Sequence, residues 1–191
     1  GTIRLKCCGH PSKGSWSMVL KAFYRRGVLE AGCDEAGRGC IAGPVFAAAV
    51  ILPEKFMDPS LNDSKQLGEE TRLKLRRIIE TEAISFGVGM ADEKEIDSLN
   101  ILNASLLAMH RAIDRLNPLP DHLLVDGRSF LSHRGIPYTC VIRGDGTYSS
   151  VAAASILAKT YRDDYMEKLH RCYPEYGWNM NKGYATRFHR D

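Results

Sequence analysis

Five short apolar segments, separated by turns and amphipathic stretches, constrain the fold of this chain more than any other feature of its sequence. Short runs of this kind, bounded by glycine-rich or polar turns, are typical of β-strands. The predicted strands are residues 29–34, 45–52, 83–90, 122–125 and 139–142. A chain of 191 residues is long enough for one domain with a substantial core and short for two.

Three other stretches have the periodicity of amphipathic helices. In one of them, apolar residues recur at spacings of four and three, at Leu102, Leu106, Met109, Ile113 and Leu116. The other two are residues 67–78 and 151–169, and the second begins with an alanine-rich half that would let a helix approach a sheet closely. Together these elements predict an α/β domain with a mixed sheet of about five strands flanked by helices, three of the strands linked as hairpins.

Composition limits the function only weakly. The 26 Lys and Arg residues against 23 Asp and Glu permit nucleic-acid binding without requiring it. Six cysteines without a CxxC pair indicate reduced thiols, and no apolar run is long enough to span a bilayer, so we expect a cytoplasmic protein. Residues 1–17 are expected to be a leader or loose extension before a single catalytic domain at 18–191. Cys7, Cys8 and His10 could be zinc ligands, but no second pair nearby completes a tetrahedral set.

Four carboxylates stand where predicted strands end. Asp34 and Glu35 end the first strand, Asp126 ends the fourth, and Asp145 follows the fifth. An Asp beside a Gly after a strand is usually only a turn residue. Because parallel strands of an α/β sheet bring their carboxyl ends to one edge, all four together predict a site there.

The chemistry of such a site follows from its charges. Clustered carboxylates raise one another's pKa values unless cations neutralise them, and oxygen ligands suit Mg²⁺ or Mn²⁺. Two such ions, roughly 3.5–4 Å apart, can clamp the attacking and leaving oxygens of a phosphodiester. Asp34 and Glu35 are adjacent and would point to opposite faces, so they share a site only if the backbone turns between or just after them. The glycines of residues 36–39 would allow that turn, although a tight loop without a ligand explains them equally well.

Six motifs in order resemble those of the ribonuclease HII family. They are DEAGRG at 34–39, LNDSKQL at 61–67, IDSLNILNAS at 96–105, LLVDG at 123–127, GDGTYSSVAAASILAKTYRD at 144–163 and NKGY at 181–184. The resemblance extends from Leu29 to His189. It implies a ribonuclease H-like fold and an endonuclease for two substrates, RNA–DNA hybrids and duplex DNA that contains ribonucleotides.

The resemblance also implies the mechanism. Cleavage would occur on the 5′ side of the ribonucleotide and leave a 3′-hydroxyl and a 5′-phosphate, in the removal of ribonucleotides and RNA primers. The metal-binding carboxylates of the family fall on Asp34, Glu35, Asp126 and Asp145, which would hold two Mg²⁺ or Mn²⁺ ions. We expect such an enzyme to act as a monomer, without membrane association.

Residues that recognise the substrate are implied in the same way. Gly37, Arg38 and Gly39 match the turn that contacts the ribose 2′-hydroxyl, the group that distinguishes RNA from DNA. Tyr184 matches a tyrosine that stacks on the sugar at the RNA–DNA junction; the alternative is a tyrosine of the core.

Phosphate contacts are implied at four more positions. These positions are Asn62, Ser64, Lys65 and Lys182. For the two lysines, the alternative interpretation is a solvated side chain on the surface without a ligand.

Two alternatives remain open. A ribonuclease HIII would share the fold and the acidic residues, but it has an additional N-terminal domain, for which the residues before position 29 are too few. A nucleic-acid-binding module without catalysis would gain nothing from carboxylates concentrated near phosphates. The sequence departs from the family at Cys40, where proline is frequent, and at Ala185, where glycine is common. It is also expected to lack the family's C-terminal tail.

Overall fold

The computed structural model describes residues 20–56, 58–61 and 67–186. Its centre is one five-stranded sheet with the strand order β3-β2-β1-β4-β5. The strands are β1 (Glu30–Ala36), β2 (Val45–Ile51), β3 (Ser85–Ala91), β4 (His122–Asp126) and β5 (Tyr138–Val141). Neighbours among β1, β2 and β3 are antiparallel, whereas β4 lies parallel to both β1 and β5. The predicted mixed α/β sheet of five strands is thus confirmed. The prediction of three hairpin-linked strands is wrong at the second link, because only β1 and β2 follow each other directly, whereas the chain between β2 and β3 contains a helix at Glu69–Glu82.

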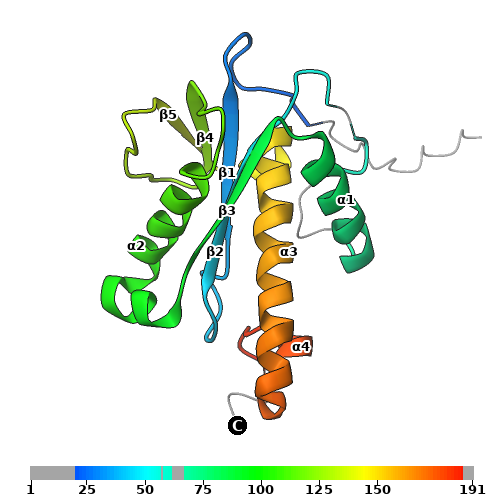
Figure 1. The fold of residues 1–191 in the computed structure, drawn as a ribbon, viewed down its shortest axis with the longest axis vertical. Helices are drawn as coiled ribbons and strands as arrows, with labels where there is room; N and C mark the ends of the chain where they lie inside the picture. Colours follow the sequence, from blue (N-terminus) through cyan, green and yellow to red (C-terminus); the bar gives the residue numbers. More distant parts are fainter. Residues whose placement is uncertain (1–19, 57, 62–66, 187–191) are drawn as a thin grey trace, which may run out of the picture.

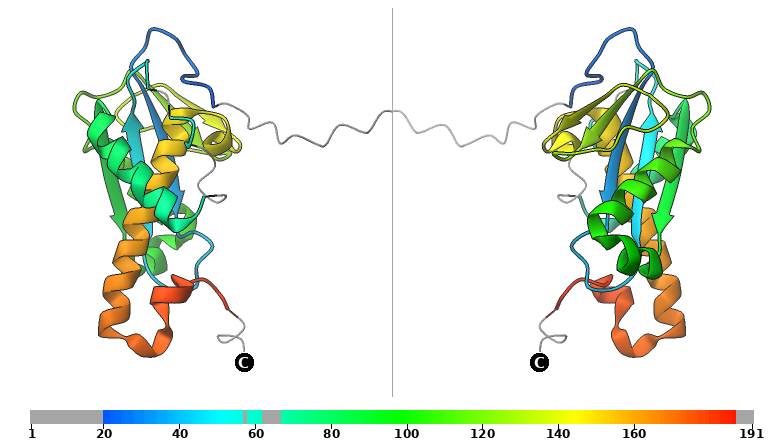
Figure 2. Two further views of the ribbon diagram at one scale, coloured as in Figure 1. Left: turned by 90° about the vertical axis from the view of Figure 1, so that its right-hand side faces the viewer. Right: turned by 90° about the vertical axis from the view of Figure 1, so that its left-hand side faces the viewer.

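Helices cover both faces of the sheet (Figures 1 and 2). Helix α2 (Glu93–Ile113) packs on one face, and helices α1 (Glu69–Glu82) and α3 (Ser149–Cys172) pack on the other. The short helix α4 (Trp178–Asn181) follows α3. None of these helices, within the residues that the structure describes, is long and apolar enough to cross a bilayer.

The alanine-rich start of α3 lies directly on β1, as its small residues predict. A Cβ atom added to Gly32 of β1 would be 2.2 Å from the carbonyl carbon of Ser150. Side chains alternate along β1, so Ala31 and Cys33 face α2 whereas Gly32 and Asp34 face α3. This close approach brings the side chains of α3 to the Asp34 carboxylate.

Helix α2 begins nine residues before the predicted apolar stripe starts at Leu102. Asp92 caps its first turn, because the Asp92 side chain accepts from the N–H of Glu95 and the Glu95 side chain accepts from the N–H of Asp92. Asn100 then interrupts the helix with a φ of 68°, and its Oδ1 accepts from the N–H groups of Leu102 and Asn103. The apolar stripe in the sequence therefore predicted only the part of α2 that follows Asn100.

Candidate active site

Asp34 lies near the carboxyl end of β1, in the middle of the sheet, and is 4% exposed. Burial, reinforced by the nearby carboxylates of Glu35 and Asp126, raises the pKa of Asp34 well above its usual value. Hydrogen bonds to Asp34 from Ser155 of α3 and from the N–H of Glu35 stabilise the carboxylate and lower its pKa, but by less than burial raises it. The result is a buried carboxyl group whose charged form needs a compensating cation.

Glu35 is part of β1, because the strand continues to Ala36. The turn follows the strand, at Gly37 with a φ of 111°, so Glu35 points to the face opposite Asp34. Its carboxylate accepts from Arg38 Nη1 at 2.9 Å. Glu35 and Asp126 line the same cavity of about 250 Å³, whose other wall is formed by α2. The predicted turn just after Asp34 and Glu35 is therefore present at Gly37, but the side chains of Asp34 and Glu35 leave the strand on opposite faces.

Asp126 and Asp145 are connected through one glycine. Asp126 ends β4, and its Oδ1 accepts from the N–H of Gly144 at 2.7 Å. Asp145 is the next residue, within a single 3₁₀ turn at Gly144–Gly146, and is 2% exposed. A Cβ at Gly144 would be 2.6 Å from a methyl group of Val141, so any larger residue between the two carboxylates would force the Val141 side chain to shift. The turn therefore places Asp145 beside the end of β4.

The donor chemistry of these carboxylates fits a hard divalent cation. Asp34, Glu35, Asp126 and Asp145 offer only oxygen ligands, and Glu35 and Asp126 lie near enough to Asp34 to disfavour its charged form. As the side chains stand, no three Asp, Glu, His or Cys residues in the described parts of the chain are grouped to hold an ion. Several of the oxygens are engaged instead, by Arg38 and by main-chain N–H groups. The metal role of the four carboxylates stays a prediction.

The two predicted substrate-contacting segments lie against each other, although they are far apart in the sequence. The N–H groups of Ile41 and Ala42, just after the Gly37–Gly39 turn, donate to the carbonyl of Gly183 at 2.9 and 3.3 Å. Gly183 has a φ of 81°, and a Cβ there would be 2.3 Å from the carbonyl oxygen of Ala42. This contact places Lys182 and Tyr184 beside the glycine-rich turn.

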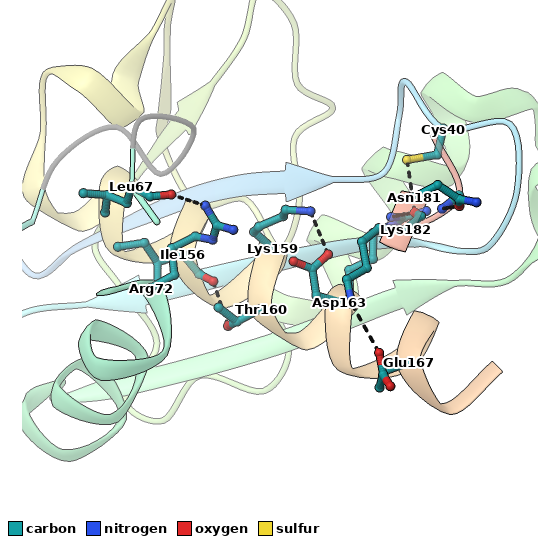
Figure 3. Close-up of polar contacts among 12 residues, drawn as sticks. Cys40, Leu67, Arg72, Ile156, Lys159, Thr160, Asp163, Glu167, Asn181 and Lys182 are labelled. Atoms are coloured by element: carbon teal, nitrogen blue, oxygen red, sulfur yellow. Dashed lines mark hydrogen bonds and ion pairs between the residues drawn. The ribbon is translucent and has the colours of Figure 1, made fainter. Parts of the chain in front are cut away.

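Tyr184 is 42% exposed, so it is not a core residue, while its role towards a substrate stays a prediction. The ammonium of Lys159 lies 5.5 Å from the centre of its ring. Lys182 is not a freely solvated lysine, because its side chain is 16% exposed and its Nζ lies 3.4 Å from Glu167 Oε2 (Figure 3). Lys159 thus supplies a positive charge near the exposed ring, and Lys182 is paired with Glu167.

The other predicted phosphate-contacting residues, Asn62, Ser64 and Lys65, lie outside the described residues, as do Cys7, Cys8 and His10. Their predicted roles stay untested. Cys40, at one of the departures from the family pattern, lies beside the predicted substrate segment, where its thiol contacts the carbonyl of Lys182 at 3.9 Å (Figure 3).

The sequence reasoning missed one central residue, Arg162 of α3. Its side chain is fully buried, and its guanidinium donates to the carbonyl oxygens of Pro44, Ala42 and Lys182 at 2.9, 3.0 and 2.7 Å. It thus joins the loop after the glycine-rich turn to the segment that holds Tyr184. A signal was present, since Arg162 is four residues after Ala158 and so lies on the apolar face of its helix.

Comparisons with known proteins agree with this architecture. Residues 31–191 match the family model described as Ribonuclease HII. A protein from Bacteroides fragilis with the same description is 62% identical over 172 residues, which are 90% of this chain and 86% of that protein. The crystal structure of the ribonuclease H2 from Pyrococcus horikoshii OT3 superposes with a TM-score of 0.68 at 28% identity, covering 83% of this chain and 81% of that chain.

A second solved structure resembles this chain in fold alone. Bst-RNase HIII in complex with Mn²⁺ has a TM-score of 0.60 at 23% identity, covering 75% of this chain and 54% of that chain. Together with the Pyrococcus enzyme, it confirms the ribonuclease H-like fold expected from the sequence.

Proposed function

Because this chain belongs to the ribonuclease HII family and is a ribonuclease of the H type, we propose that it hydrolyses the RNA strand of RNA–DNA hybrids. It also cuts on the 5′ side of ribonucleotides embedded in duplex DNA, leaving a 3′-hydroxyl and a 5′-phosphate. The observation that supports this most is the buried Asp34 carboxyl with Glu35 and Asp126 close to it, at the ends of two parallel strands. The family match favours this function over the ribonuclease HIII alternative.

Asp34, Glu35, Asp126 and Asp145 would hold two divalent ions, Mg²⁺ or Mn²⁺. When bound, such a pair supplies an activated water and stabilises the leaving oxygen of the phosphodiester. The Mn²⁺ in the similar Bst-RNase HIII structure supports this class of cofactor. A binding module without catalysis is disfavoured, because buried carboxylates beside a phosphate would repel it unless cations were present.

The chain's own residues then select the substrate. The main-chain N–H groups of Gly37, Arg38 and Gly39 would contact the ribose 2′-hydroxyl. The turn is open at Gly39, where no atom lies within 4 Å of an added Cβ, whereas Gly37 is buried against the Arg162 side chain. Tyr184 would stack on the deoxyribose that follows the ribonucleotide. Lys182 would contact a neighbouring phosphate. In the free protein its ammonium is paired with Glu167, so the phosphate would compete with that carboxylate for it.

A DNA duplex with one ribonucleotide, labelled at either end, tests the proposal directly. In Mg²⁺ or Mn²⁺ we expect a single cut on the 5′ side of the ribonucleotide, with a 3′-hydroxyl on the upstream product. Excess chelator should abolish cleavage and added metal should restore it. The same duplex without the ribonucleotide is the control; cutting of that duplex, or full cleavage in chelator, would contradict the proposal.

Substitution of Tyr184 by Ala is expected to slow cleavage at a single ribonucleotide by roughly ten- to a hundredfold. Stacking contacts of aromatic side chains contribute about 1–3 kcal/mol, and each ~1.4 kcal/mol is tenfold in rate. A continuous RNA–DNA hybrid has no junction at most of its cleavage positions and should be affected less. Initial rates on both substrates, with a melting curve, measure the difference.

Tyr138→Ala is a matched control for this experiment. Tyr138 is also about half exposed, at 41%, and its ring contacts Phe130 rather than the segment that holds Tyr184. It should leave the preference between the two substrates unchanged. Equal losses on both substrates in Tyr184→Ala, with a lowered melting temperature, would show a structural role instead.

A further inference from the structure

The N-terminal strap, defined as residues 20–30, lies against the turn between β5 and α3. The N–H of Lys21 donates to the carbonyl of Thr147 at 2.8 Å, and the N–H of Ser149 donates to the carbonyl of Lys21 at 2.9 Å. Lys21 and Tyr148 thus form a parallel bridge outside the main sheet. In both views of Figure 2, the blue start of the described chain lies beside the yellow turn that precedes α3.

Aromatic contacts add to this bridge. The ring of Tyr24 stacks on His122 of β4, with centroids 5.9 Å apart, and meets the edge of Tyr148 at 5.8 Å. The ammonium of Lys21 lies 5.7 Å from the centre of the Tyr148 ring. The strap is therefore attached both to the start of β4 and to the residues just before α3.

Glu30 stabilises the shape of the strap. Its carboxylate is buried and accepts from the main-chain N–H groups of Tyr24 and Arg25, both at 3.1 Å. His122 Nδ1 lies 3.6 Å from the same carboxylate. Because Glu30 begins β1, the strap is held in place by two neighbouring strands of the sheet.

The residues that the strap contacts support the turn of Asp145. The N–H groups of Thr147 and Tyr148 both donate to the carbonyl of Gly144, at 2.9 and 2.8 Å. On its other side, Gly144 donates its own N–H to Asp126. Asp145 is thus held between the end of β4 and the two residues attached to the strap.

We propose that Lys21 and Tyr24 are positioning residues that orient the Asp145 carboxylate for metal binding. The inference rests on the proposed function, because it takes Asp145 as a metal ligand. Arg143, which precedes the turn, has a left-handed φ of 58°, a conformation that a non-glycine residue keeps only when its surroundings hold it. The strap begins before residues 31–191, which match the family model, so that match assigns it no role.

The test measures metal binding directly in the full chain. Tyr24→Ala removes the ring, which is 43% exposed and so leaves no large internal cavity. Calorimetric titration with Mn²⁺ should give roughly tenfold weaker binding, as is typical when a residue that orients a metal ligand is removed. The Mn²⁺ concentration for half-maximal cleavage should rise by the same factor. Tyr24→Phe keeps the ring and should bind Mn²⁺ like the wild type.

Two comparisons separate positioning from general stability. Tyr173→Ala removes another half-exposed ring at the far end of α3 and should leave Mn²⁺ binding unchanged. In an Asp145→Asn background, Tyr24→Ala should have no further effect on Mn²⁺ binding, because the ligand it orients is already lost. If Tyr24→Ala does not fold, Tyr24→Leu keeps the apolar volume without the ring and gives the same test.

A lower melting temperature in Tyr24→Ala with unchanged Mn²⁺ affinity would overturn the inference and leave the proposed function intact. A wild-type protein that binds no Mn²⁺ and cuts no substrate would overturn both. Additive losses in the double variant would also overturn the inference, since they would mean that Tyr24 acts on metal binding by a route independent of Asp145.

Discussion

Substitution of Asp34 by Asn is expected to lower the rate of hydrolysis by roughly a thousandfold or more, equivalent to about 4 kcal/mol in the barrier. The amide keeps the shape of the side chain but removes the negative charge that a divalent ion needs. Asp126→Asn should give a similar loss, because Asp126 is the carboxylate at the end of the neighbouring parallel strand. Single-turnover cleavage of the one-ribonucleotide duplex measures both variants.

The fold should survive the Asp34 substitution. In metal-free protein, the pKa of Asp34 is raised by burial and by two nearby carboxylates, so at neutral pH its charge opposes folding. The melting temperature in chelator should therefore not fall in Asp34→Asn. Added Mn²⁺ should stabilise the wild type and have much less effect on the variant, because ligand binding stabilises only a protein that binds it.

Asp164→Asn provides the matched control for this pair of measurements. Asp164 is about half exposed on α3 and pairs with Arg76 on the protein surface, away from the carboxylates of the sheet. Its loss should change neither cleavage nor the response to Mn²⁺. If Asp34→Asn retained near-normal turnover with the same metal dependence, Asp34 would not be a metal ligand.

The sequence was sufficient for the five strands and for the position of Asp126 relative to them. Apolar runs bounded by turns located all five strands, and a carboxylate at the end of an apolar run correctly placed Asp126 at the end of β4. The predicted end of the first strand was less accurate, because β1 continues through Glu35 to Ala36. Pairing with β2 extends the strand by two residues beyond its apolar run, and a contact between strands is invisible in local sequence.

The contacts that organise the site could not be derived from local patterns. Asn100 interrupts α2, so the first part of that helix shares no stripe with the second. The strap is held by Lys21 and Tyr24, whose partners lie about a hundred or more residues further along the chain. Arg162 similarly acts through carbonyl groups of two distant loops. Main-chain carbonyls exist at every residue, so no residue type in the sequence marks those that accept these bonds.

Replacement of Arg162 by Met is expected to destabilise the protein by roughly 3 kcal/mol or more. The substitution leaves the carbonyls of Ala42, Pro44 and Lys182 without these donors, and each buried unsatisfied group costs about 1–3 kcal/mol. For a chain of this size, the melting temperature should fall by roughly 6–12 °C. Arg162→Lys should be intermediate, because a single ammonium cannot reach all three carbonyls with the geometry of a guanidinium.

The same substitution should also affect substrate selection, since Arg162 joins the loop after the glycine-rich turn to the segment of Tyr184. Assayed well below its melting temperature, Arg162→Met should lose most of its preference for the single ribonucleotide while its Mn²⁺ affinity stays near that of the wild type. Arg134→Met is the control, because Arg134 is about half exposed and pairs with Asp114 at the surface, where an ion pair contributes about 1 kcal/mol or less. An Arg162→Met protein that melts like the Arg134 variant and keeps its substrate preference would show that the two loops hold their positions without the buried guanidinium.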